Sequence, residues 1–250
     1  MTNPAAIGNL RSKISTYNHA RHEPVRRVLR WMVTNIGWRV FARIDPSRIS
    51  GLENLPAAGP AILMINHIAF IDPIVVLGNL PRNIVPMAKA EAYRLPVWGI
   101  FPRLWDVIPV HREELDRRAL ERALDVLRAG EVILIAPEAH RHPALAQAKE
   151  GIAYLAHKSG APVIPVAIEN TPGYPTLLGP WNAHKPGAYF RLGRPFRFKP
   201  VAGRLPRERL RQMTDEAMYQ LAALLPEHRR GYYSDLSKAT METMETMEWV

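Results

Sequence analysis

Short apolar segments that alternate with helix-like stretches constrain the fold of this chain most strongly. Residues 61–65, 84–87, 132–136 and 163–168 are short apolar runs without regular polar alternation. Strands of this kind are typical of a parallel sheet that is buried on both faces. The sequence therefore predicts an α/β fold, in which helices flank a mostly parallel sheet.

The segments between those runs support the same interpretation. Further strands are expected at residues 106–112 and 189–198. The helix expected after residue 112 carries its apolar side chains on one face, and Gly130 is expected to end it. Other helices are predicted at residues 74–78, 149–159 and 207–225.

The N-terminal region, residues 1–45, is predicted to contact a membrane. An amphipathic helix is expected at residues 25–41, with Trp31 and Trp38 on one side near Arg27. Indole rings beside arginine suit the headgroup zone of a bilayer. The same pattern also fits a helix that packs on the domain core, and the residues alone leave both interpretations open.

The rest of the chain divides into one domain and a tail. Residues 46–230 are predicted to form a single α/β domain, since no second boundary or long repeat is visible. Residues 231–250 contain Met-Glu-Thr repeats and are predicted to be a flexible tail.

Charge and cysteine content narrow the possible partners. The 250 residues carry a formal net charge of +10, which favours an anionic membrane, a phosphorylated substrate or nucleic acid. There is no cysteine, which excludes disulfides, cysteine-bound zinc and a cysteine nucleophile. No apolar run reaches the roughly 18 residues of a spanning helix, and no secretory signal is expected. We therefore expect a protein that lies on a membrane surface or dips into it.

The segment Asn66-His67-Ile68-Ala69-Phe70-Ile71-Asp72-Pro73 is the most informative one for chemistry. His67 follows a predicted buried strand, at the edge of the sheet where open α/β folds bind their ligands. A tight turn would bring Asp72 back to one ring nitrogen, leaving the other to take a proton from an alcohol. By itself, this spacing also fits a structural hydrogen bond.

The spacing matches an H-x-x-x-x-D motif, and the chain from about Gly51 to Pro200 resembles the glycerolipid acyltransferase family, which includes bacterial 1-acylglycerol-3-phosphate acyltransferases. Four blocks similar to those of the family occur in the expected order: Gly51–Asp72, Lys89–Arg112, Ala136–Arg141 and Val163–Val166. The resemblance implies transfer of a fatty acyl group from acyl-CoA or acyl carrier protein to a lysophospholipid hydroxyl. It implies no metal and no cofactor beyond the acyl donor.

The resemblance also implies which residues act. His67 is expected to be the general base and Asp72 its orienting partner. An anionic headgroup needs cations near the histidine, so Lys89, Arg112 and Arg141 are expected to bind it, with His140 as a further donor. Glu138 is expected to hold an acceptor hydroxyl or to anchor Arg141. The same side chains also fit ordinary surface ion pairs, such as Lys89 with Glu91.

The third block departs from the family's usual F-P-E-G-T-R. Ala136, Ala139 and His140 stand where the family has Phe, Gly and Thr. Glycine there permits a positive φ or a close backbone approach, and Ala139 disfavours both. His140 is able to bind phosphate itself. The reaction class is therefore better determined than the identity of the acceptor.

Other functions fit the sequence less well. It lacks the G-x-S-x-G elbow of serine hydrolases and the glycine-rich nucleotide loops, and His140 with His142 is a weak metal pattern. A non-enzymatic binder of membranes or nucleic acid is the rival interpretation, but its basic residues should cluster on one surface. We expect direct attack by the acceptor, no nucleic-acid partner, and a location on the cytoplasmic face of the cell membrane.

Overall fold

The computed structural model describes most of the chain beyond residue 47. The described residues are 48–94, 99, 102–103, 105–111, 116–171, 188–201, 203 and 205–248, together with Pro24, Val28, Trp31 and Met32. The predicted helix at residues 25–41 lies largely outside this set, as does Arg112. Within the described residues, no helix has both the length and the apolar character needed to cross a bilayer.

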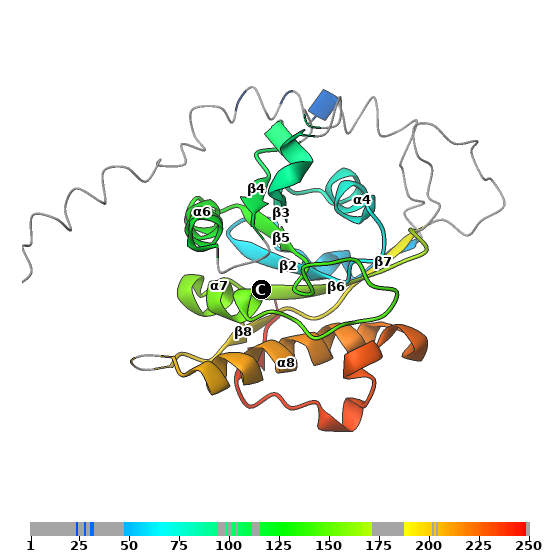
Figure 1. Ribbon diagram of the computed structural model, residues 1–250, viewed down its shortest axis with the longest axis vertical. Helices are drawn as coiled ribbons and strands as arrows, with labels where there is room; N and C mark the ends of the chain where they lie inside the picture. Colours follow the sequence, from blue (N-terminus) through cyan, green and yellow to red (C-terminus); the bar gives the residue numbers. More distant parts are fainter. Residues whose placement is uncertain are drawn as a thin grey trace, which may run out of the picture.

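Nine strands form one sheet in the described part of the chain, in the order β1-β7-β6-β2-β5-β3-β4, with β8 and β9 continuing from β6 (Figure 1). The strands are β1 (Ile49–Ser50), β2 (Ala61–Ile65), β3 (Ile84–Lys89), β4 (Ile108–Val110), β5 (Val132–Ile135), β6 (Val163–Glu169), β7 (Tyr189–Leu192), β8 (Phe196–Phe198) and β9 (Met244–Thr246). Strands β6, β2, β5, β3 and β4 run parallel to one another. The predicted α/β fold with a mostly parallel sheet is confirmed.

Helices cover both faces of this sheet. They are α4 (Asp72–Asn79), α6 (Arg117–Arg128), α7 (Gly151–Ser159) and α8 (Arg207–Leu224). Short 3-10 helices occur at Leu52–Asn54, Ala90–Arg94, Glu227–Arg229, Gly231–Tyr233 and Leu236–Lys238. Figure 1 shows α4 and α8 on opposite sides of the sheet.

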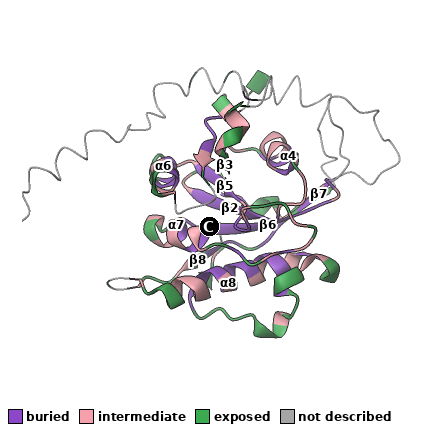
Figure 2. Cartoon of the chain, viewed as in Figure 1, coloured by how far each residue is buried: buried purple, intermediate pink, exposed green. Residues whose placement is uncertain are grey.

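The apolar runs of the central strands are explained by two separate cores. In β2, Ile62 and Met64 pack with residues of α6, α7 and α8, whereas Leu63 and Ile65 pack with α4. Successive side chains of a strand point to opposite faces, so a strand covered on both sides must be apolar throughout. Figure 2 shows the strands as buried and the outer faces of the helices as exposed.

The segment expected to be one strand at residues 189–198 forms two. Strand β7 pairs antiparallel with the end of β6, and β8 pairs antiparallel with its beginning. At the break, the Gly193 N–H donates to Pro165 O at 2.8 Å. A Cβ on Gly193 would meet side-chain atoms of Pro165 and Leu224 within 3 Å, so the break needs a residue without a side chain.

The predicted tail at residues 231–250, expected to be disordered or loosely docked, packs on the domain over its described part, residues 231–248. Strand β9 pairs antiparallel with β8. The buried Glu216 carboxylate of α8 accepts hydrogen bonds from Thr240 Oγ1 at 2.6 Å and from Thr243 N at 2.9 Å. Burial alone would raise the pKa of Glu216, but the hydrogen bonds from Thr240, Thr243 and Glu242 outweigh it and lower the pKa. The repetitive composition of the tail did not predict this docking, because it depends on Glu216, which lies outside the tail in α8.

Candidate functional site

The site begins where β2 ends at the carboxyl edge of the sheet. The Asn66 side chain bridges to β6, since Nδ2 donates to Ile168 O at 2.9 Å and Oδ1 accepts from Ile168 N at 2.7 Å. This two-way bond fixes the chain immediately before His67. His67 therefore leaves the sheet from a defined position, as expected for a functional residue in an open α/β fold.

His67 and Asp72 form the predicted pair. His67 Nδ1 lies 2.9 Å from Asp72 Oδ2, and the Asp72 side chain is fully buried. The same carboxylate oxygen accepts the backbone N–H groups of Ile68 at 2.7 Å and Ala69 at 2.8 Å. Asp72 also begins α4, where the helix dipole stabilises a negative charge. The carboxylate thus orients the ring through Nδ1, and Nε2 is the nitrogen that can meet a substrate proton.

The third block forms a turn after β5. Ala139 has a φ of 63°, in the left-handed region, and its N–H donates to Ala136 O at 3.0 Å. The conformation that Ala139 was expected to disfavour is therefore present. A side chain in this region costs about 1–2 kcal/mol relative to ordinary helical backbone. The turn is thus kept without glycine, at some expense of stability.

Glu138 lies beneath this turn, with 5% of the residue exposed. Its Oε2 accepts Ala146 N at 2.8 Å, while Oε1 is buried with no hydrogen-bond partner among the described residues. Burial raises the pKa of Glu138 to about 7, although the backbone N–H groups of Ala146 and His67 act in the opposite direction. The carboxylate is therefore directed at the backbone of its own loop and of His67. The expectation that it binds the acceptor or Arg141 stays a prediction.

Replacing Glu138 with glutamine should change how stability depends on pH. The folded carboxyl has a pKa near 7, against 4.5 ordinarily, so the folded protein binds a proton that the unfolded chain releases between these values. The free energy of unfolding of the wild type should fall by about 3 kcal/mol from pH 4.5 to pH 8 through this group. Denaturant unfolding of Glu138→Gln should lack that decrease. The exposed Glu208→Gln should retain it, and equal slopes in all three proteins would refute the assignment.

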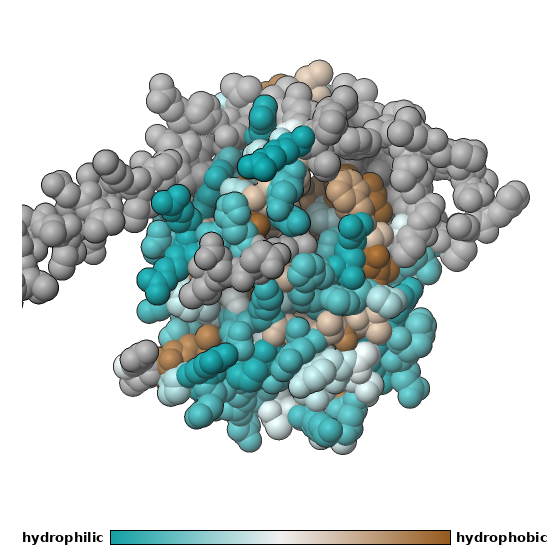
Figure 3. All heavy atoms as spheres, viewed as in Figure 1, coloured by the Kyte–Doolittle hydropathy of each residue, from teal (hydrophilic) through white to brown (hydrophobic). Residues whose placement is uncertain are grey.

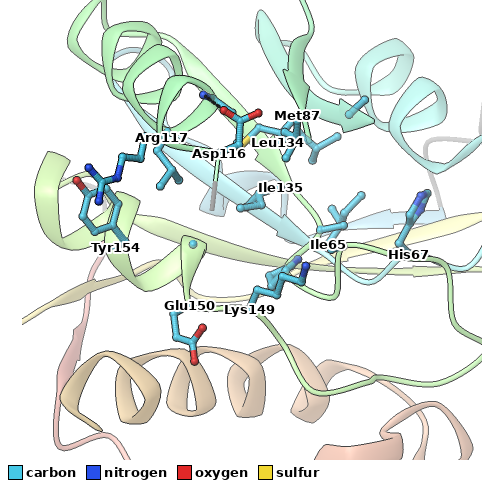
Figure 4. A pocket seen from close by; sticks show the side chains of 18 of the residues that line it. Ile65, His67, Met87, Asp116, Arg117, Leu134, Ile135, Lys149, Glu150 and Tyr154 are labelled. Atoms are coloured by element: carbon cyan, nitrogen blue, oxygen red, sulfur yellow. Dashed lines mark hydrogen bonds between the residues drawn. The ribbon is translucent and has the colours of Figure 1, made fainter. Parts of the chain in front are cut away.

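A pocket of about 880 Å³ extends from His67 along the ends of the central strands (Figure 4). Its apolar wall includes Ile65, Met87, Leu134 and Ile135, from β2, β3 and β5. Tyr154 of α7 lies at the end away from His67 in Figure 4. The pocket therefore offers an elongated apolar surface that starts at the histidine.

The cations that line this pocket are not those predicted. They are Lys149, Arg117 and Arg207, accompanied by the carboxylates Asp116, Glu121 and Glu150. The Asp116 carboxylate caps α6 by accepting Ala119 N at 3.0 Å. Only Lys149 carried a sequence signal, because it follows the third block. Arg117 and Arg207 begin helices whose position relative to β2 is not readable from the sequence.

Of the predicted headgroup residues, the described ones Lys89, His140 and Arg141 lie at the same edge of the sheet but outside the pocket lining. Lys89, at the end of β3, pairs with Glu91 at 3.3 Å, and both side chains are about half exposed. Such an exposed pair contributes little to stability, so Lys89 can exchange partners at low cost. His140 and Arg141 are exposed on the third-block loop. Their roles stay predictions. In the described ranges, no cluster of three histidine or acidic side chains is arranged to hold a metal ion.

A C-terminal segment, Glu227–Tyr233, holds the end of the third-block loop. Leu145 N donates to Arg229 O at 2.9 Å, and Tyr232 N donates to Leu145 O at 2.8 Å. Ala148 N donates to the Tyr233 hydroxyl at 3.2 Å. No sequence pattern predicts this clamp, because it joins residues more than 80 positions apart. The clamped loop leads directly to Lys149.

Comparisons with known proteins agree with this arrangement. The family model described as Acyltransferase matches residues 46–169. A 1-acyl-sn-glycerol-3-phosphate acyltransferase of Borreliella burgdorferi is 32% identical over 127 residues, covering 49% of this chain and 51% of that protein. A protein of the same name from Bacillus subtilis is 28% identical over 123 residues, covering 49% of this chain and 62% of its own length. The chain thus matches about half to three-fifths of the length of these relatives.

The fold is also similar to a solved structure. The crystal structure of the 1-acyl-sn-glycerophosphate acyltransferase PlsC from Thermotoga maritima superposes with a TM-score of 0.56, at 23% identity. The match covers 87% of this chain and 83% of the other. At this identity the likeness concerns the fold, and it extends beyond the segment that the family model matches.

Proposed function

This chain belongs to the acyltransferase family through residues 46–169, and on that premise we propose that it transfers a fatty acyl group from a thioester to a lysophospholipid hydroxyl. The proposed reaction converts 1-acylglycerol-3-phosphate to phosphatidate. One observation carries the proposal: His67, which is paired with the buried Asp72, lies at one end of a largely apolar pocket. A base beside an apolar surface suits an acceptor alcohol and a long acyl chain.

The proposed reaction proceeds by direct attack. His67 Nε2 removes the proton of the acceptor hydroxyl as the oxygen attacks the thioester carbonyl carbon. The tetrahedral intermediate then collapses, the C–S bond breaks, and the imidazolium returns the proton to the leaving thiolate. The products are an oxygen ester and a free thiol. Asp72 stabilises the imidazolium throughout, and the sequence has no cysteine to form an acyl-enzyme.

The apolar wall of the pocket supports a fatty acyl donor. Each methylene that leaves water contributes about 0.8 kcal/mol to binding. A chain lying along Ile65, Met87 and Leu134 would hold its carbonyl carbon near His67. We propose acyl-CoA or acyl carrier protein as the donor, with no further cofactor.

The headgroup of the acceptor is proposed to be a phosphate monoester. Lys89 ends β3 and Arg141 lies in the loop after the neighbouring β5, at the edge that carries His67, and His140 precedes Arg141 in the sequence. Arg112 lies outside the described residues, and its part in this site is proposed from the sequence alone. Both His140 and Arg141 are exposed, as residues that meet an incoming anion must be. The positive charge of these residues complements a dianionic phosphate.

The kcat/KM values of different acceptors test this assignment. Wild-type protein should prefer lysophosphatidate over monoacylglycerol and lysophosphatidylcholine. Arg141→Ala should lower kcat/KM for lysophosphatidate by about 10- to 150-fold, because it removes a charge-assisted hydrogen bond. Arg128→Ala, at an exposed arginine paired with Asp125 on α6, should leave it unchanged. Equal use of monoacylglycerol and lysophosphatidate by the wild type would refute the phosphate assignment.

We further propose that the protein works at the cytoplasmic face of the cell membrane as a peripheral or monotopic protein. The amphipathic pattern of residues 25–41 and the net charge of +10 support binding to an anionic leaflet. Val28 and Trp31 are both more than half exposed. Figure 3 also shows hydrophobic atoms near α4, and Phe70, just before that helix, is 53% exposed. These side chains suit a surface that meets lipid.

A further inference from the structure

Thr171 contacts the second oxygen of the Asp72 carboxylate. Its hydroxyl donates to Asp72 Oδ1 at 2.5 Å, and the threonine is 1% exposed. The other oxygen, Oδ2, already accepts the bonds from His67, Ile68 and Ala69. The Thr171 hydroxyl therefore holds one oxygen of the Asp72 carboxylate while His67 contacts the other. Together these two contacts restrict rotation of the carboxylate group.

The backbone around Thr171 is arranged to deliver this contact. Thr171 follows β6, and the intervening Asn170 has a φ of 61°, a left-handed conformation that asparagine adopts more readily than most residues. Two residues earlier, Ile168 is bound on both sides by the Asn66 side chain. The end of β6 is thus hydrogen-bonded to the segment that carries His67 at two places. Ile168 bonds to Asn66, and Thr171 bonds to Asp72.

We propose that Thr171 is a positioning residue for acyl transfer, an inference that rests on the proposed function. By holding Oδ1, it keeps Oδ2 aligned with His67 Nδ1, so that the proton stays on Nδ1 and Nε2 stays basic. Thr171 is not a nucleophile, because its buried hydroxyl donates to Asp72 and the residue does not line the pocket. A carboxylate that loses such a bond can rotate, and the ring then loses its fixed tautomer.

Two substitutions separate the hydroxyl from the shape of the side chain. Thr171→Val keeps the branched shape and removes the donor, and should lower kcat about 10- to 100-fold with little change in acceptor KM. Thr171→Ser restores the donor and should recover most of the kcat. The control is Thr214→Val in α8, which removes a buried hydroxyl bonded to Leu210 O at 2.9 Å, and should retain wild-type kcat. Wild-type kcat in Thr171→Val, or equal losses in the valine and serine variants, would overturn the proposal.

A second readout does not require the proposed reaction. The imidazole N–H proton bonded to Asp72 should give a low-field NMR signal that disappears in His67→Ala. In Thr171→Val this signal should shift or broaden, whereas in Thr171→Ser and Thr214→Val it should remain. An unchanged signal in Thr171→Val would overturn the positioning role. If the wild type acylates no lysolipid, the proposed function fails, and the NMR result still decides whether Thr171 orders the pair.

Discussion

Replacing His67 with alanine should reduce acyl transfer by about 10²- to 10⁴-fold, the usual contribution of a general base. His67 is the titratable group that the structure holds at one end of the pocket with a buried carboxylate behind it. Without the imidazole, the acceptor hydroxyl keeps its proton and attacks the thioester poorly. Asp72→Asn should have a smaller effect, because the ring remains but loses its orienting charge. The measurement is kcat for thiol release with saturating lysolipid.

Loss of activity in these variants must be separated from loss of fold. Asp72 keeps its bonds from Ile68, Ala69 and Thr171 when the imidazole is removed, so His67→Ala should still fold, and thermal unfolding checks this. His157→Ala, in the last turn of α7, serves as the matched histidine control and should keep wild-type kcat. Full turnover in His67→Ala would show that another group takes the proton.

The substitution Gly231→Ala should destabilise the protein by about 2–5 kcal/mol, since overpacking and a left-handed backbone both add to its cost. Gly231 has a φ of 47°, and a Cβ there would lie 2.2 Å from Leu145 O. This position lies within the clamp between Glu227–Tyr233 and the third-block loop. A forced separation would also displace Lys149, which lines the pocket proposed to hold the acyl chain, so KM for the acyl donor should rise.

Gly160→Ala is the matched control for that substitution. Gly160 also has a positive φ, at 65°, but an added Cβ would meet nothing within 4 Å. Its cost should therefore be limited to the backbone term of about 1–2 kcal/mol, with KM unchanged. The difference in free energy of unfolding between the two variants, measured with denaturant, gives the cost of the close contact between an added Cβ at position 231 and Leu145 O. Equal destabilisation by the two substitutions would mean that the clamp is easily displaced.

Local sequence signals predicted the central sheet and the contact between His67 and Asp72 well. Unbroken apolar runs such as residues 61–65 directly reflect burial on two faces, and five residues are enough to return Asp72 to His67. Contacts between distant segments were not predictable in this way. Thr171 meets Asp72 across 99 positions, and Gly231 meets Leu145 across a similar gap, with no repeated spacing to reveal either.

The charged lining of the pocket illustrates the same limit. The prediction for Lys89 and Arg141 rests on their positions at or just beyond the ends of strands that meet at one edge of the sheet, and strand order alone supports it. Arg117 and Arg207 begin α6 and α8, and their positions depend on how these helices pack against the sheet. The polar residues at the start of a helix do not predict that packing. Composition was also misleading for the tail, where Thr243 and its neighbours dock through Glu216 despite a repetitive sequence.

The most direct test of acyl transfer is to incubate the full chain with acyl-CoA and lysophosphatidate, and to measure free thiol and lipid product together. The proposed mechanism predicts equal amounts of thiol and phosphatidate from the wild type, and neither above background from His67→Ala. Thiol release with free fatty acid as the only lipid product would identify a thioesterase. Release of no thiol with any lysolipid would identify a non-enzymatic binder, and either result would contradict acyl transfer.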